Sequence, residues 1–200
     1  CTVIKNFRET NLGCTRGVSS AVSWFFENEE KGIILEDDCA VDESFFYFAQ
    51  ELLEKYKDDN RIFSINATNF LAKKGFIVGS YYFSRVFHCW GWASWRRAWK
   101  YYDLEMKDLD DFVKQRVLKN YYKDKYIIKY WHGTLKSVQE NLNTWDFQAA
   151  FIPFKENMLC INPCVNLVSN IGFEVNVDAT HPISKDEDPH LIMSKINFPL

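Results

Sequence analysis

The sequence contains no apolar run that approaches the roughly 20 residues needed to cross a bilayer. It opens on Cys1 and has no secretory signal at its start. It also lacks a basic excess, because the formal net charge is -3, whereas nucleic-acid binding calls for a face rich in Lys and Arg. We therefore expect no transmembrane segment in this chain and no nucleic-acid partner. We expect a cytoplasmic protein or one peripheral to a membrane.

The cysteines lack the spacing of a structural zinc site. Six are spread along the chain, and only Cys160 and Cys164 stand close together, as a C-x-x-x-C without a second pair. We expect free, buried thiols in preference to disulfides. Internal repeats, low-complexity tracts and linkers are also missing. With 47% hydrophobic residues, 200 residues can bury one substantial core, so we predict a single domain over residues 1–200.

The first third of the sequence alternates between strand-like and helix-like segments. This alternation is typical of an α/β protein with a mainly parallel sheet flanked by helices. Apolar spacing predicts strands over residues 2–8, 32–35 and 61–67, with helices over 14–30 and 42–59 between them. After residue 68 the pattern is irregular. There it predicts a turn leading into a short helix over 89–103, a helical region over 108–143, a helix that begins near 144, and strand-like residues over 158–170.

Three consecutive acids, Glu36, Asp37 and Asp38, follow the predicted strand over 32–35. Like charges so close repel one another. Ligands of open parallel sheets bind beyond the carboxyl ends of the strands, where we expect these acids to lie. If the chain stays extended, Glu36 and Asp38 point to one side, and their oxygens suit Mg²⁺ or Mn²⁺ completed by water and a phosphate-bearing substrate. The alternative is that the acids only start a turn before a helix capped by Asp42.

The stretch "GIILEDDCAVDESFFYF" resembles the acidic metal motif of the GT-A nucleotide-sugar glycosyltransferases, in an E-D-D form of their D-x-D motif. The similarity is to the N-acetylglucosaminyltransferase-I-like group and to bacterial or viral family-2-like enzymes. It continues in order through "NLGCTRGVSSAV", "CWGWASWRRAW", "TWDFQ", "CINPCVNLVSNIGF" and "ATH", and so covers nearly the whole chain. The resemblance implies a GT-A-like, Rossmann-related fold and a metal-dependent enzyme. Such an enzyme moves a sugar from a nucleotide-diphosphate donor, such as a UDP-sugar, to a glycan or another hydroxyl acceptor.

The resemblance also implies roles for individual residues. Asp38 would bind Mn²⁺ or Mg²⁺ directly, while Glu36 and Asp37 would contact the metal's water, the ribose or the donor sugar. His181 is a candidate further metal ligand that would close over the diphosphate, although a lone loop histidine is often ordinary surface. Contacts to the nucleotide or diphosphate would come from Arg8, Asn11 and Arg16, and the loop that shapes the sugar pocket from Trp90, Gly91 and Trp92.

Asp146, in "TWDFQ", occupies the position that resembles the catalytic base of the inverting enzymes. The residue opens a predicted helix, and the positive end of the helix dipole favours a carboxylate there. Asp146 could instead only satisfy backbone N–H groups of that first turn. A single base with no covalent nucleophile implies inversion at the anomeric carbon. Sugars stack their C–H faces on aromatic rings, which fits a platform at Trp90 and Trp92; Trp95 and Trp99 are expected in the core.

The chain departs from the family pattern at its beginning. Family domains begin with a strand-helix-strand unit that grips the nucleotide base, whereas this sequence starts at about the third strand. We expect those elements to lie outside this chain or to be absent from a shortened variant. Two other functions therefore stay open: a degenerate carbohydrate-binding or assembly module without transferase activity, and a metal-dependent phosphoesterase built on the same acids.

Overall fold

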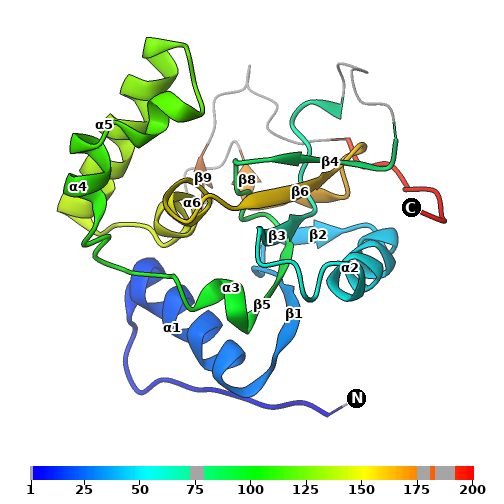
Figure 1. Cartoon of the computed structure of the whole chain (residues 1–200). Coiled ribbons are helices and arrows are strands. Elements are labelled where there is room, and N and C mark those ends of the chain that lie inside the picture. The colour runs from blue at the N-terminus through cyan, green and yellow to red at the C-terminus, as the bar shows by residue number, and fades with distance from the viewer. Residues whose placement is uncertain (1, 73–78, 175–180, 183–191) are drawn as a thin grey trace.

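The computed structural model describes residues 2–72, 79–174, 181–182 and 192–200. Its centre is a five-stranded sheet in the order β1-β5-β3-β6-β4. The strands are β1 (Lys31–Ile34), β3 (Ile62–Asn66), β4 (Tyr81–Ser84), β5 (Trp92–Trp95) and β6 (Leu159–Pro163). Helices flank this sheet (Figure 1), so the chain has an α/β fold.

Two faces of the sheet carry separate cores. Helix α2 (Ser44–Lys55) packs on one face. The other is covered by α1 (Gly13–Asn28), α3 (Arg96–Trp99), α4 (Leu109–Lys114), the 3-10 helix η2 (Val117–Asn120), α5 (Lys125–Asn141) and α6 (Asp146–Lys155). Neighbouring residues of one strand serve opposite cores, as Trp92 and Ala93 do on β5, because strand side chains alternate between the two faces. Trp95 and Trp99 are buried, as expected.

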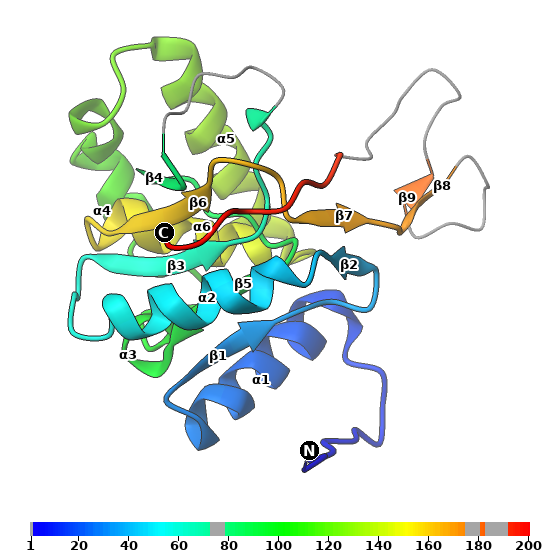
Figure 2. The same ribbon diagram turned by 90° about the vertical axis from the view of Figure 1, so that its right-hand side faces the viewer.

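The prediction of a mainly parallel sheet is wrong. Only β3 and β6 pair in parallel, and the other three pairings in the sheet are antiparallel. The third antiparallel pairing joins β4 to β6, and the other two come from β5, a strand that the sequence analysis assigned to a turn and a short helix. It lies between β1 and β3 and runs against both. β1, β3 and β6 nevertheless point the same way, as their arrows in Figure 2 show, so their carboxyl ends share one edge.

Antiparallel β5 brings its start to that same edge, because Trp92 pairs with Ile34 and with Asn66, the last residues of β1 and β3. Beyond the edge lies a two-stranded sheet of β2 (Cys39–Val41) and β7 (Val168–Asn170), seen at the right in Figure 2. Further along the chain, β8 (Phe173–Glu174) pairs with β9 (His181–Pro182). Elements distant in sequence therefore converge around the end of β1.

The predicted strand over residues 2–8 is not formed. These residues are extended and exposed, and Val3 and Phe7 keep 76% and 84% of their surface. A strand needs a neighbour to bond its N–H and C=O groups, and this segment pairs with none of the described strands. The expected capping by Asp42 is confirmed, since its Oδ1 accepts hydrogen bonds from the backbone N and the hydroxyl of Ser44. No helix within the described ranges is long and apolar enough to span a membrane.

Candidate functional site

The acidic triplet forms a turn directly after β1. The strand ends at Ile34, and the backbone N–H of Cys39 donates to the carbonyl of Glu36 at 3.1 Å, so the acids do not continue an extended strand. Glu36 and Asp38 are partly buried and Asp37 is exposed. The expected strand-like alternation is therefore replaced by a turn, whose residues meet different parts of the chain. We call residues 36–38 the acidic turn.

Asp38 is held by the β2–β7 pair. Because Cys39 pairs with Asn170, the Asn170 side chain can donate from Nδ2 to Asp38 Oδ2, at 3.3 Å. The backbone N–H of Ile171 donates to the Asp38 carbonyl at 2.8 Å. Gly172 lies so close that an added Cβ would stand 2.7 Å from Asp38 Oδ2. The carboxylate is thus fixed in place by residues about 130 positions further along the chain.

Glu36 is held by the residue that precedes α6. Trp145 Nε1 donates to Glu36 Oε1 at 2.8 Å. Burial raises the pKa of the Glu36 carboxyl above its usual value, and the charges of Asp38, Asp146 and Asp37 raise it further, whereas the indole hydrogen bond lowers it. Asp146 therefore lies close enough to interact electrostatically with the acidic turn. The structure brings together the two acidic elements that the sequence separates by more than 100 residues.

Asp146 begins α6, as predicted. Its Oδ1 accepts a hydrogen bond from the Thr144 hydroxyl, and its Oδ2 lies 3.9 Å from Cys89 Sγ. Burial raises the pKa of the Cys89 thiol well above its usual value, and the charges of Asp146 and Glu36 add to the effect. The thiol is therefore protonated and faces a carboxylate. Every described cysteine is free, as expected, but the expectation that the thiols are buried holds fully only for Cys160, and Cys14 is exposed.

Members of this acidic cluster line two separate clefts. The first, of about 920 Å³, lies between α1, the end of β1 and the acidic turn, and we call it the acidic cleft. It is lined by Gly13, Cys14, Gly17, Val18, Ala21, Val22, Phe25, Ile33, Ile34, Leu35, Glu36, Asp37, Asp38, Asn143 and Thr144. Most of its wall is apolar, and its carboxylates gather at one end. This combination suits a ligand with a planar or apolar part and a part that carries a cation.

The second cleft, of about 470 Å³, contains Asp146, and we call it the aromatic cleft. Its lining residues are Thr68, Phe70, Val86, Phe87, His88, Cys89, Trp90, Tyr130, Trp131, Asp146, Phe147 and Ala150. Thr144 lines the acidic cleft and Asp146 the aromatic cleft, and their side chains are hydrogen-bonded. The start of α6 therefore connects the two clefts.

Trp90 lines the aromatic cleft, whereas the two residues after it do not. Gly91 is buried at φ +65°, and an added Cβ would stand 3.2–3.3 Å from the side chains of Leu35, Val41 and Ala67. Trp92 is fully buried in the core against Phe87. The expected sugar platform thus differs from the geometry: Gly91 serves close packing and Trp92 lies inside the core.

The residues expected to contact the nucleotide lie beside the acidic cleft and not in its lining. Arg8 is exposed and donates to the Ser20 hydroxyl at 3.3 Å. Asn11 Oδ1 accepts from the backbone N–H of Gly13, and Arg16 is exposed on α1. His181 contributes its backbone to β9 opposite Phe173, and its side chain is outside what the structure describes.

The described residues contain no group of three or more His, Cys, Asp or Glu side chains arranged to hold a metal. The acidic turn instead offers Asp38 and the second oxygen of Glu36, both hard oxygen donors at the rim of a cleft. Mg²⁺ and Mn²⁺ are commonly held by one or two carboxylates with substrate phosphates and water as the other ligands. The donor chemistry fits such an ion if the ligand supplies the remaining oxygens.

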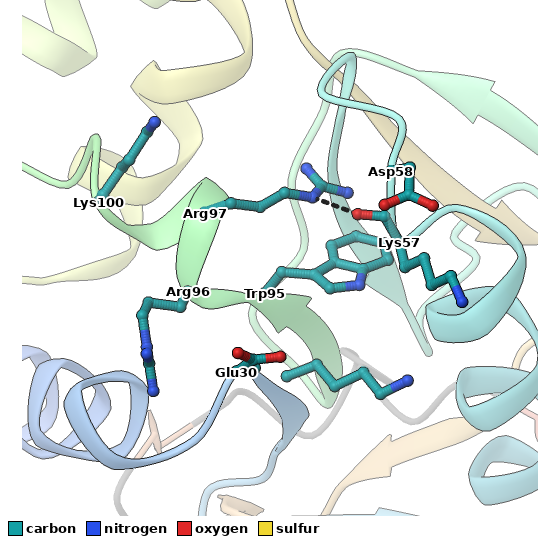
Figure 3. A pocket seen from close by; sticks show the side chains of 8 residues that line it. Glu30, Lys57, Asp58, Trp95, Arg96, Arg97 and Lys100 are labelled. Atoms are coloured by element: carbon teal, nitrogen blue, oxygen red, sulfur yellow. Dashed lines mark hydrogen bonds between the residues drawn. The ribbon is translucent and has the colours of Figure 1, made fainter.

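A third cleft, of about 510 Å³, lies at the other end of β1 and β5 and is lined largely by basic side chains. Figure 3 shows Arg97 lying beside Trp95 there, with a hydrogen bond to the Lys57 carbonyl. The Arg97 guanidinium, 4.3 Å from the Trp95 ring, also donates to the carbonyls of Tyr56 and Ile62. Lys31 and Lys57 pair with Glu54. These cations are occupied by protein groups, which gives little support to an anion site.

Sequence reasoning missed the residues that hold the acids, namely Trp145, Asn170 and Cys89, and gave His88 no role. Three of them lie inside motifs that it did identify: Trp145 in "TWDFQ", Cys89 in "CWGWASWRRAW" and Asn170 in "CINPCVNLVSNIGF". His88 directly precedes Cys89. Adjacency in sequence was the available signal, but the direction of each side chain depends on the fold. In comparisons with known proteins, no protein-family model matches the chain and no curated protein matches it significantly.

Proposed function

We propose that this chain is a metal-dependent, inverting glycosyltransferase of the GT-A type that uses a nucleotide-diphosphate sugar. One observation carries the proposal: the acidic turn lines one cleft and Asp146 lines a second, and the hydrogen bond between Thr144 and Asp146 joins the walls of the two clefts. Transfer between two substrates needs two adjoining sites with a base between them. The UDP-sugar would occupy the acidic cleft, and the hydroxyl acceptor would occupy the aromatic cleft.

The acidic turn would hold the diphosphate end of the donor. Asp38 would bind Mn²⁺ or Mg²⁺ directly, with Glu36 beside it. When bound, such an ion neutralises the negative charge that builds on the leaving diphosphate. The β2–β7 contacts fix Asp38 in advance, so the carboxylate needs little reorganisation when the donor binds.

Asp146 would act as the general base. The acceptor oxygen forms a bond to the anomeric carbon and gives its proton to the Asp146 carboxylate. The bond from the anomeric carbon to the phosphate oxygen breaks, and its electron pair leaves with the nucleoside diphosphate. Cys89, the thiol nearest Asp146, is protonated and therefore a poor nucleophile, which favours a single displacement with inversion over a covalent intermediate.

The direct test is nucleoside-diphosphate release. Purified protein would be incubated with UDP-glucose, UDP-galactose, UDP-N-acetylglucosamine and their GDP-linked counterparts, with Mn²⁺ and a mixture of glycan acceptors. The proposal expects acceptor-dependent release that EDTA abolishes and that falls at least about 100-fold in Asp146→Asn. Release that is unchanged by EDTA and by Asp146→Asn would contradict it.

The same samples distinguish the other two functions. A carbohydrate-binding module would be stabilised against heat by a free glycan and not by UDP with Mn²⁺, because a ligand raises apparent stability only where it binds the folded state. A phosphoesterase would release orthophosphate from simple phosphoesters without an acceptor. The described part of the chain offers no cluster of three metal-binding side chains, which is what a metal phosphoesterase normally uses.

A further inference from the structure

The aromatic cleft has the chemistry of a site for an uncharged sugar ring. Phe70 stands against His88 and Trp90, with ring centroids 5.0 and 5.5 Å apart, and Tyr130, Trp131 and Phe147 line the cleft from α5 and α6. Phe70 and Tyr130 keep 50% and 58% of their surface exposed, although both are large aromatic residues. Aromatic faces next to a carboxylate suit a ligand that presents both C–H faces and hydroxyl groups.

His88 is a polar side chain of this cleft whose hydrogen-bonding groups have no protein partner within the described part of the chain. Its imidazole makes no hydrogen bond within the described part of the chain, and it packs against the Phe70 ring in a T-shaped arrangement. Burial lowers its pKa from 6.5 to about 4, so the ring is neutral at physiological pH. A neutral imidazole has one nitrogen that donates and one that accepts. A sugar hydroxyl can satisfy either nitrogen.

The charge of the cleft sets a limit on the ligand. Its described lining contains no Lys or Arg. His88 is neutral, and burial keeps the Cys89 thiol protonated. Asp146 therefore provides the one formal charge among the described lining residues, and Glu36 lies near it. A uronate, sialate or phosphate placed here would be repelled by these carboxylates without a cation to compensate.

We propose that the aromatic cleft binds a neutral pyranoside as the acceptor, with its ring against the Phe70–Trp90 wall and one of its hydroxyls hydrogen-bonded to His88. The role of this pyranoside as acceptor rests on the proposed transferase function, whereas its binding to the cleft does not depend on that function. His88 acts as a specificity-determining residue. Asp146 accepts the proton of the hydroxyl that reacts.

The test uses ligand-observed saturation-transfer NMR with the full chain, with and without UDP and Mn²⁺. The probes are methyl glycosides of glucose, galactose, mannose, N-acetylglucosamine, xylose and fucose, each neutral, and the methyl glucuronide as the acidic match of the glucoside. We expect saturation transfer to at least one neutral glycoside and at least about tenfold weaker binding of the glucuronide than of that glycoside. No transfer to any neutral probe, or equal binding of the glucuronide, would overturn the proposal.

His88→Phe keeps an aromatic ring and removes both nitrogens. We expect it to weaken the neutral glycoside roughly five- to tenfold, the loss typical of one hydrogen bond, with UDP binding unchanged. His132→Phe is the matched control, because His132 lies on α5 outside the lining of this cleft, and it should bind like wild type. Equal binding by both variants would remove His88 from the site.

Failure of this inference is distinguishable from failure of the transferase proposal. If UDP binds with Mn²⁺ and no neutral glycoside binds, the proposed acceptor class is wrong and the transferase proposal stands. If a neutral glycoside binds in a His88-dependent way while UDP with Mn²⁺ does not, the aromatic cleft is a sugar site and the transferase reading fails.

Discussion

The indole N–H of Trp145 donates to the Glu36 carboxylate at 2.8 Å, joining residues 109 positions apart. This contact ties the acidic turn after β1 to the start of α6, and thereby fixes Glu36 relative to Asp146. Asp38 has an equivalent tie to β7 through Asn170. The fold therefore holds carboxylates that repel one another, which is the arrangement expected where a bound cation relieves that repulsion.

Removing the Trp145 N–H tests this tie. Trp145→Phe keeps an aromatic ring in the core but leaves the partly buried Glu36 without its donor, so we expect the free energy of unfolding to fall by about 2–3 kcal/mol, measured by urea denaturation. Trp24→Phe is the control, because the Trp24 indole makes no hydrogen bond in the described structure and is only partly buried. Equal destabilisation of both variants would show that the Trp145–Glu36 hydrogen bond does not stabilise the fold.

Asp146→Asn separates binding from chemistry. The amide is almost isosteric with the carboxylate but cannot accept the acceptor's proton, so we expect unchanged calorimetric affinity for UDP with Mn²⁺ and a transfer rate at least about 100-fold lower. Asp110→Asn, at an exposed position of α4 that pairs with Lys136, should leave both quantities unchanged. Normal turnover by Asp146→Asn would remove this residue from the role of base.

Gly91 is predicted to be required for folding. Ala at this position would combine an unfavourable positive φ with contacts of 3.2–3.3 Å to the side chains of Leu35, Val41 and Ala67, so Gly91→Ala should lower the free energy of unfolding by about 2 kcal/mol or more. Gly133→Ala is the opposite case, because Gly133 lies inside α5 with nothing within 4 Å of an added Cβ. That variant should gain about 0.5–1 kcal/mol. Thermal or urea unfolding of the pair checks both signs.

His88 should make stability depend on pH. Its pKa is lowered on folding. Its contribution to the free energy of unfolding is therefore fully present above pH 6.5, the ordinary pKa of histidine, and is lost as the pH falls from 6.5 to about 4. Over that range the free energy of unfolding of wild type should therefore fall by up to about 3 kcal/mol more than that of His88→Phe. A difference that stays constant from pH 7 to pH 4 would contradict the buried, neutral imidazole.

The sequence was sufficient for the α/β class, for α1, α2 and the start of α6, and for the position of the acids after β1. Regular apolar spacing predicts such elements because each buries one face. It did not predict β5, since "WASW" reads equally well as a turn between glycine and a helix. This omission hid two of the three antiparallel pairings, and the direction of β4 against β6 is the third. The strand predicted over residues 2–8 failed for the complementary reason: strand formation depends on a neighbour that no local pattern can supply.

The site was only partly predictable for the same kind of reason. Glu36 and Asp38 were identified from residue type and position, and Asp146 from the family resemblance. Their partners Trp145 and Asn170 depend on how α6 and β7 fold back onto the acidic turn. Trp92 was placed at the surface because it belongs to an aromatic motif, yet side-chain alternation on β5 turns it into the core. Composition can identify candidate ligands of a site, but it cannot give the directions of the side chains that hold them.

The most direct test of the central claim is calorimetric titration of UDP into the protein, with and without saturating Mn²⁺, for wild type, Asp38→Ala and the control Asp110→Ala. The account predicts that UDP binding requires Mn²⁺, is retained in the control and weakens more than about 100-fold in Asp38→Ala, since loss of a direct ligand should cost at least as much as loss of an outer-shell partner. UDP binding that is independent of Mn²⁺, or equal in wild type and Asp38→Ala, would contradict it.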